Sequence, residues 1–214
     1  RPLPEADHRY LRQIARRTWC YFSSFVTAET CWLPPDNYQV AHQNRLAMRT
    51  SPTNIGLWMT SVLGAHDAGY LTVNQVVDTL TRSMATINRL ERFEGHLLNW
   101  YDIQSLAPLE PRYVSTVDSG NLIGALWSLE QGLDELLHAP LLTGKVFTAL
   151  ADTGEILKQS VANEDGKPLY LHTLEELLSD CHTPPSTVVD FLRLQRRVQT
   201  NAGSVCATPT ITPW

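Results

Sequence analysis

The stretch from residue 93 to residue 122, FEGHLLNWYDIQSLAPLEPRYVSTVDSGNL, combines large aromatic side chains with carboxylates and asparagines. A flat ring such as Trp100 or Tyr101 suits the C–H face of a pyranose, and charged or amide groups around it suit the hydroxyls. This matching matters because a buried polar group without a partner costs about 1–3 kcal/mol. Sugar binding is therefore one interpretation of this stretch.

A second stretch, residues 28–51, has a similar composition, with Trp32, Asp36, Asn37 and Arg49 among its side chains. Glycoside chemistry requires two carboxyl groups facing each other, about 5–5.5 Å apart in retaining enzymes and about 6.5–9.5 Å apart in inverting ones. Both stretches contain carboxylates, but the sequence does not give the distances between them.

Each candidate also has a simpler structural interpretation. Asp118 is equally suited to cap a helix, and Asp36 could close its own turn. Glu94 ends a helical pattern, where its charge opposes the helix dipole, so it is either an unusual acid or a solvated helix end. Trp58 and Trp127 lie at helical spacing within apolar stripes, which places both in the predicted core.

Composition and charge disfavour several classes of protein. The 214 residues carry a formal net charge of −5, which argues against nucleic acid as the main partner. Hydrophobic residues make up 43% and charged residues 18%, as in ordinary globular proteins. No apolar run approaches the roughly 20 residues that span a bilayer. The four cysteines form no C-x-x-C pair and the histidines form no H-E-x-x-H. We therefore expect reduced thiols, no metal, no cofactor and no direct membrane contact by this segment.

Helical periodicity runs through almost the whole chain. Ser51 before Pro52, and the capping box of Thr72 and Gln75, indicate helix starts. Gly69 and Gly95 are expected to end helices. Strand signals are nearly absent, so an all-α fold of about seven helices is predicted. The expected helices lie within residues 6–26, 52–68, 73–94, 119–136, 141–161, 173–181 (capped by Thr173 and Glu176) and 186–198.

Two long connections, residues 28–51 and 93–118, alternate with short ones. This alternation is expected when helical hairpins stand side by side and one end of the array is elaborated. Long connections in compact domains are usually functional or disordered, and the large aromatics in these two favour function. The sequence therefore predicts that the sugar-binding candidates gather at one end of a set of helices.

Four motifs in these regions resemble the bacterial cyclic β-1,2-glucan synthases: WLPPDNYQ, RTSPTNIGL, RLERFEGHLLNWYD and LAPLEPRYVSTVDSGNL. The resemblance is to the N-terminal part of the middle, glucoamylase-like module of those large membrane enzymes, and covers about residues 7–133. The missing start Met and the abrupt end at TPTITPW suggest a piece of a longer chain. We expect residues 1–214 to form a single α-helical domain, with 1–140 matching best and the helices of 141–214 less well defined.

The resemblance implies a fold and an activity. The fold is an (α/α)6 toroid around a sugar-binding cleft, of which this chain would supply about half. In that family one module builds a linear β-1,2-glucan, the middle module closes the ring by transglycosylation, and a third trims chain length. The implied partners are a β-glucan and the rest of a large multi-domain chain, with this module on the cytoplasmic side of the bacterial inner membrane.

The resemblance also implies the site residues. The main catalytic carboxylates are expected to lie outside this chain, so its candidates mainly hold the glucan. If a carboxylate here acts, Asp102 is the first candidate and Glu94 the second. The substrate-binding candidates are Asp36, Asn37, Arg49, Asn54, Asn99, Trp100, Tyr101, Arg112, Tyr113 and Asp118.

Three hypotheses remain open from the sequence: part of a glucan transglycosylase or hydrolase, a non-catalytic carbohydrate-binding module, and a purely structural helical scaffold. The scaffold hypothesis predicts that Trp100 and Tyr101 are buried and fully packed. The other two predict exposed rings on a concave surface.

Overall fold

The computed structural model describes residues 3–40, 45–140, 143–161, 170–181, 185 and 187–206. Helices dominate this part of the chain, which confirms the prediction of an all-α fold with about seven helices. The helices are α1 (Glu5–Phe25), α2 (Pro52–Asp67), α3 (Val73–Ile87), α4 (Thr116–His138), α5 (Lys145–Val161), α6 (Tyr170–Cys181) and α7 (Val188–Cys206), with a short 3₁₀ turn η1 at Ala28–Thr30.

The described chain also contains six very short strands, which the sequence pattern does not predict. They form three antiparallel pairs, each of two strands: β1 with β2, β3 with β6, and β4 with β5. The strands are β1 (Tyr38–Gln39), β2 (Arg45–Leu46), β3 (Arg49–Thr50), β4 (Arg92–Phe93), β5 (His96–Leu97) and β6 (Tyr101–Asp102). Two-residue strands are too short to show an alternating pattern, so sequence periodicity cannot detect them.

The chain divides into two compact units. Unit 1 comprises Arg1–Arg16, Ala68–Tyr70 and Leu142–Trp214, and unit 2 comprises Arg17–Asp67 and Leu71–Leu141. The expectation of one domain over residues 1–214 stays a prediction.

The core of unit 2 forms between α2, α3, α4 and the end of α1. Trp58 is only 2% exposed, stacks on Trp19 with ring centroids 5.8 Å apart, and donates its indole N–H to Ser83 Oγ at 2.9 Å. Its predicted place in the core is confirmed. The helices α2 and α4 approach closely at Gly56, where an added Cβ would lie 2.9 Å from the Cβ of Ala125.

Trp127 is not in the core, so the prediction for it is wrong: its side chain is 68% exposed. The face of α4 that packs on the core carries Leu122, Leu126 and Leu129, and Trp127 lies on another face of the helix. Val117 is exposed as well, so α4 carries apolar residues both on its covered face and on its exposed face. Periodicity alone therefore did not show which face is covered.

Most of the predicted helix ends of unit 2 are observed. Ser51 Oγ accepts from the backbone N–H of Asn54 at the start of α2. Thr72 and Gln75 exchange the two bonds of a capping box, at 2.8 and 3.3 Å. Gly69 adopts a φ of 87° two residues after α2 ends at Asp67, as a helix stop requires.

Three predicted helix boundaries are wrong. The helix α3 ends at Ile87, and Gly95, assigned as its stop, lies in the later turn between β4 and β5. The N-cap of α4 is Ser115, whose Oγ accepts from the backbone N–H of Asp118, so Asp118 is not the cap. Thr173 lies inside α6, which begins at Tyr170.

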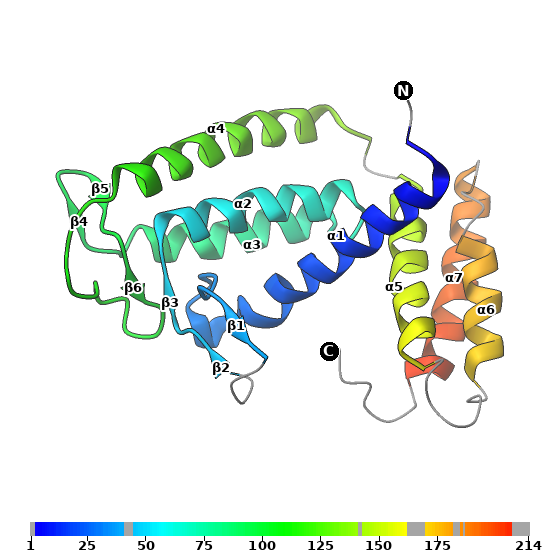
Figure 1. Cartoon of the computed structure of the whole chain (residues 1–214). Helices are drawn as coiled ribbons and strands as arrows, with labels where there is room; N and C mark the ends of the chain where they lie inside the picture. The colour runs from blue at the N-terminus through cyan, green and yellow to red at the C-terminus, as the bar shows by residue number, and fades with distance from the viewer. Residues whose placement is uncertain are drawn as a thin grey trace. The chain divides into compact units, whose positions relative to one another are not determined.

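The three short strand pairs lie at one end of the helices of unit 2 (Figure 1). The pairs β3–β6 and β4–β5 gather where α2 and α4 begin and where α3 ends, and the pair β1–β2 lies beside the end of α1. The two long connections of the sequence therefore meet at this end, as the alternation of long and short connections predicted. We call this region the loop end of unit 2.

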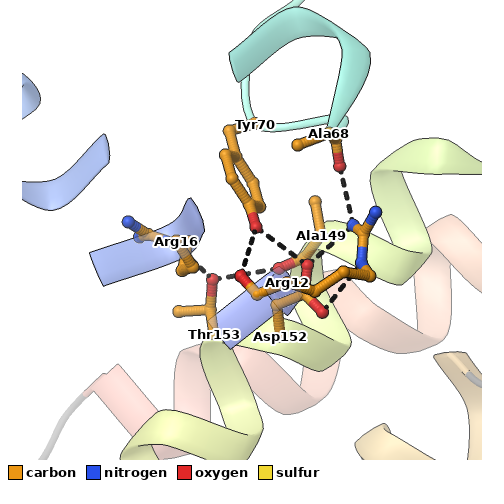
Figure 2. Close-up of polar contacts among 7 residues, drawn as sticks. All are labelled: Arg12, Arg16, Ala68, Tyr70, Ala149, Asp152 and Thr153. Carbon is orange, nitrogen blue, oxygen red and sulfur yellow. Dashed lines mark hydrogen bonds and ion pairs between the residues drawn. The ribbon is translucent and has the colours of Figure 1, made fainter. Parts of the chain in front are cut away.

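Unit 1 has a small core between α5, α6 and α7, in which Phe147 stacks edge-on against Phe191 at a centroid distance of 5.1 Å. A polar network joins α5 to other segments of the same unit (Figure 2). Asp152 accepts two bonds from the Arg12 guanidinium, at 2.7 and 3.1 Å, and one from the Tyr70 hydroxyl at 3.0 Å. Burial, and then the nearby Asp152 carboxylate, raise the pKa of Tyr70. The phenol therefore stays a hydrogen-bond donor.

Candidate functional site

The pairing of β3 with β6 joins the two stretches that the sequence singled out. In its register Arg49 lies opposite Asp102, and Thr50 lies opposite Tyr101. Residues some fifty positions apart in the chain thus become neighbours at the loop end of unit 2. The expectation that the candidates gather in one place is met for those near this strand pair.

Asp36 is the centre of a polar cluster in this region. One carboxylate oxygen accepts from Asn37 Nδ2 at 2.9 Å and from Arg49 at 3.0 and 3.2 Å, and the other accepts from Asn54 Nδ2 at 3.2 Å. The Asp36 side chain is 18% exposed and that of Arg49 is 50% exposed. Asp36 therefore fixes side chains from three parts of the chain, which is more than closing its own turn.

Trp100 is held against this cluster. The Arg49 guanidinium carbon lies 4.7 Å from the centroid of the Trp100 ring, within the range of a cation–π contact. The backbone carbonyl of Trp100 also accepts from the N–H of Leu109 at 2.9 Å. Trp100 is partly exposed, so its ring is positioned and still reachable from solvent.

Tyr101 differs from its neighbour, and the prediction that its ring is exposed is wrong. The side chain is fully buried, at 0% exposure. Its hydroxyl accepts from the backbone N–H of Leu98 at 2.7 Å and donates to the carbonyl of Glu91 at 2.6 Å. Burial raises the pKa of Tyr101, which keeps this donor protonated. Tyr101 is a structural residue that anchors the segment next to Trp100.

Asp102, the first catalytic candidate, has one carboxylate oxygen occupied by its own turn. That oxygen accepts from Ser105 N at 2.7 Å, Ser105 Oγ at 2.8 Å and Gln104 N at 3.0 Å. The bonds from Ser105 are the main reason that the pKa of Asp102 lies below its usual value. A carboxylate that stays ionised is a poor general acid at neutral pH, so a base or nucleophile is the only catalytic role its charge suits.

Glu94, the second catalytic candidate, does not end a helix. It and Gly95 form the two-residue turn of the β4–β5 hairpin, with φ values of 47° and 86°. Such turns need two positive φ angles and normally use Asn-Gly or Asp-Gly. Glu-Gly is a weaker signal, which is why the sequence pattern did not reveal the hairpin. Glu94 is exposed at its tip.

The turn gives a stability prediction. Glu94→Asn is expected to raise the free energy of unfolding by about 0.5–1 kcal/mol, because Asn tolerates the left-handed conformation better than Glu. For a chain of this size that corresponds to about 1–4 °C in Tm. Thermal unfolding followed by circular dichroism measures it. Glu94→Gln, which removes the charge alone, is the control and should leave Tm nearly unchanged. An equal rise in both variants would show that charge, not backbone conformation, is responsible.

Three further candidates follow this hairpin in the chain. Arg112 is 46% exposed and forms ion pairs with Glu91 at 2.9 Å and Glu110 at 3.3 Å. Tyr113 is 51% exposed, and its backbone carbonyl accepts from the N–H of Asn99. Asn99 itself is only 3% exposed. Arg112 and Tyr113 are thus accessible, whereas Asn99 is part of the interior.

Asp118 lies at the start of α4 and binds across to α2. Its carboxylate accepts from Thr53 Oγ1 at 2.5 Å, and the same Thr53 hydroxyl accepts from Asn121 Nδ2 at 3.1 Å. The sequence pattern does not single out Thr53. The only available signal was its place in SPTN at the start of a predicted helix, which does not specify a partner.

Several buried polar atoms at the loop end have no protein partner. Among the described residues these include Asn37 Oδ1, Thr50 Oγ1, Asn99 Oδ1 and Ser119 Oγ. Buried polar groups normally find a partner in protein, water or ligand. These four atoms lie in or beside the two long connections, at the loop end of unit 2. Within the same described part of the chain, no group of His, Cys, Asp or Glu is arranged to hold a metal ion, and no helix is long and apolar enough to cross a bilayer.

The fold and this site together define an all-α chain of helical hairpins whose elaborated end carries a partly exposed aromatic ring amid charged and amide side chains. Over 153 residues the chain is 46% identical to the cyclic beta-(1,2)-glucan synthase NdvB of Rhizobium meliloti (strain 1021). The resemblance to the cyclic β-1,2-glucan synthases is therefore confirmed. The matched segment is 71% of this chain and 5% of that relative, so the chain is similar to a small part of a far longer enzyme. No family model matches the chain.

Two solved structures of glucoamylase-like proteins are also similar. One, from Bacteroides fragilis NCTC 9343, has a TM-score of 0.49 and 14% identity, over 76% of this chain and 40% of its own. The other, from Bacteroides caccae ATCC 43185, has a TM-score of 0.41 and 17% identity, over 81% and 36% of the respective chains. At these TM-scores neither likeness bears on the function of the chain.

Proposed function

We propose that this chain binds β-1,2-glucan at the loop end of unit 2, as the N-terminal part of a module that closes the glucan ring by transglycosylation. The observation that carries the proposal is the assembly of Asp36, Arg49 and Trp100. It brings together, around one ring, the two stretches whose composition suits sugar binding. The similarity to a cyclic beta-(1,2)-glucan synthase supports the identity of the sugar.

Several parts of this proposal extend beyond the chain itself. The hairpins are proposed to form part of an (α/α)6 toroid within a large multi-domain chain. That enzyme would lie in the bacterial inner membrane, with this module on the cytoplasmic side.

The chain on its own is proposed to bind glucan without reacting with it. Asp102 has a lowered pKa and one oxygen committed to its turn, and Glu94 lies on an exposed hairpin tip. Neither is suited to act as the general acid that glycoside chemistry requires. This favours the alternative of a non-catalytic carbohydrate-binding module for the isolated chain, with the catalytic carboxylates supplied by other parts of the enzyme.

The test is a calorimetric titration of linear β-1,2-glucan into the 214-residue chain. Wild type is expected to bind saturably, and Trp100→Ala to bind at least about tenfold more weakly, a loss of about 1.4 kcal/mol. Trp127→Ala is the matched control, because it removes an equally large ring that is exposed on α4 outside the site. It should bind like wild type.

Two results would count against the proposal. Absence of binding by well-folded wild type would show that this chain alone does not form a glucan site. Equal affinity in wild type and Trp100→Ala would show that the ring is not a sugar platform. A comparison with linear β-1,3-glucan, to which weaker binding is expected, tests the linkage.

A further inference from the structure

A pocket of about 340 Å³ lies at the loop end of unit 2, beside the β4–β5 hairpin. It is lined by Glu91, Arg92, Phe93, Leu98, Arg112 and Val114. Pockets for small ligands span about 300–1,000 Å³, so this one is at the small end of that range. The glucan site proposed at Asp36, Arg49 and Trp100 uses none of these six residues, although Arg112 is one of the substrate-binding candidates from the sequence.

The pocket is held in shape by bonds that involve no ligand. The buried Tyr101 hydroxyl bonds both the backbone N–H of Leu98 and the carbonyl of Glu91. These two lining residues are therefore held in place relative to each other. Arg92 donates to the carbonyl of Ile87 at 3.4 Å, near the end of α3. Leu98 is 6% exposed, whereas Phe93 is 59% exposed. The pocket thus has an apolar floor and an open aromatic ring on its wall.

The charges around the pocket are balanced. Arg112 donates to Glu91 and also pairs with Glu110, and all three side chains are substantially exposed. A phosphate or a carboxylate would have to compete with these glutamates for Arg112. A neutral polyol would not, because a guanidinium has five N–H donors and each carboxylate has several acceptor positions. Arg92 adds a second guanidinium to the lining, so Arg92 and Arg112 are matched by Glu91 and Glu110. This balance suits an uncharged, hydroxyl-rich ligand.

We propose that this pocket is a second subsite for a glucose unit of the same glucan, and this inference rests on the proposed function. Phe93 is the platform for the C–H face of the ring, and the Arg112–Glu91 pair binds hydroxyls. Trp100 and Phe93 lie seven residues apart in the chain, and Tyr101, the neighbour of Trp100, bonds both Glu91 and Leu98, which flank Phe93. One extended glucan chain then contacts both rings.

The test uses the 214-residue chain and a long linear β-1,2-glucan. Phe93→Ala and Arg112→Gln are each expected to weaken binding about tenfold while Phe93→Tyr keeps it near wild type. Trp127→Ala is the control for loss of an exposed ring. Inorganic phosphate at millimolar concentration is expected not to compete. Thermal unfolding of each variant confirms that it is folded before its affinity is compared.

The outcomes separate this inference from the proposed function. If Trp100→Ala loses binding and both Phe93→Ala and Arg112→Gln bind like wild type, the second subsite is refuted and the proposed function stands. If inorganic phosphate at millimolar concentration displaces the glucan, the assignment of the pocket to a neutral ligand is wrong. If wild type binds no glucan at all, both proposals fail.

Discussion

Tyr101→Ala is expected to lower the free energy of unfolding by about 3–5 kcal/mol, the usual cost of deleting a large buried ring. The side chain has no exposed surface, and its hydroxyl is bonded to the backbone of both Leu98 and Glu91. The substitution therefore leaves a cavity and also removes the partner of a buried N–H. Because the net stability of a domain is only about 5–15 kcal/mol, this change removes a large part of it.

Urea denaturation followed by tryptophan fluorescence measures this loss. Tyr101→Phe keeps the ring and removes only the hydroxyl, so its expected cost is smaller, about 1–3 kcal/mol. The matched control is Tyr113→Phe, since the Tyr113 side chain is half exposed. It should change stability by less than about 0.5 kcal/mol. A destabilisation of Tyr101→Phe no larger than that of the control would contradict a structural role for the hydroxyl.

Asp152→Ala has the second largest expected effect, a loss of about 2–3 kcal/mol. Removing one partner of a fully buried ion pair costs about 3–5 kcal/mol. The cost here is smaller because the Arg12 side chain is 32% exposed, although that of Asp152 is only 11% exposed. The change also leaves the Tyr70 hydroxyl without its carboxylate partner (Figure 2).

Chemical denaturation of the whole chain, monitored by circular dichroism, tests this prediction. Asp78→Ala is the control, because the Asp78–Arg82 pair is exposed on α3 and such pairs contribute about 0–1 kcal/mol. Asp152→Asn, which keeps the shape and part of the hydrogen bonding, should fall between the two. Equal effects of Asp152→Ala and Asp78→Ala would show that the network is not a main support of unit 1.

The features that the sequence predicted correctly are those set by neighbouring residues. The capping box of Thr72 and Gln75 and the cap at Ser51 are formed by groups within three positions of each other, so local sequence determines them. Gly69 ends α2 for the same reason, because its positive φ depends on its own lack of a Cβ. The all-α character follows from helical periodicity that is repeated along most of the chain.

The features that the sequence did not predict depend on distant contacts. The bonds of Asp36 to Arg49 and Asn54 require two connections to fold against each other, and the local Asx-turn interpretation did not anticipate them. Tyr101 is adjacent to Trp100 and has a similar chemistry, but Tyr101 begins β6 and is fully buried, whereas Trp100 precedes the strand and is partly exposed. The four motifs contain the residues that meet around Asp36 and Trp100, whereas the contacts of each residue required the three-dimensional structure.

The close approach of α2 and α4 at Gly56 has a consequence for the polar end of the same two helices. The contact of Gly56 with Ala125 leaves no room for a larger side chain, so it sets the separation of the helix axes. Three residues before Gly56, Thr53 binds Asp118, within one or two turns of that contact. Because Gly56 has no side chain, the two helices come close enough for Thr53 to bond Asp118. A glycine in the interior therefore sets the spacing of α2 and α4 at the loop end of unit 2.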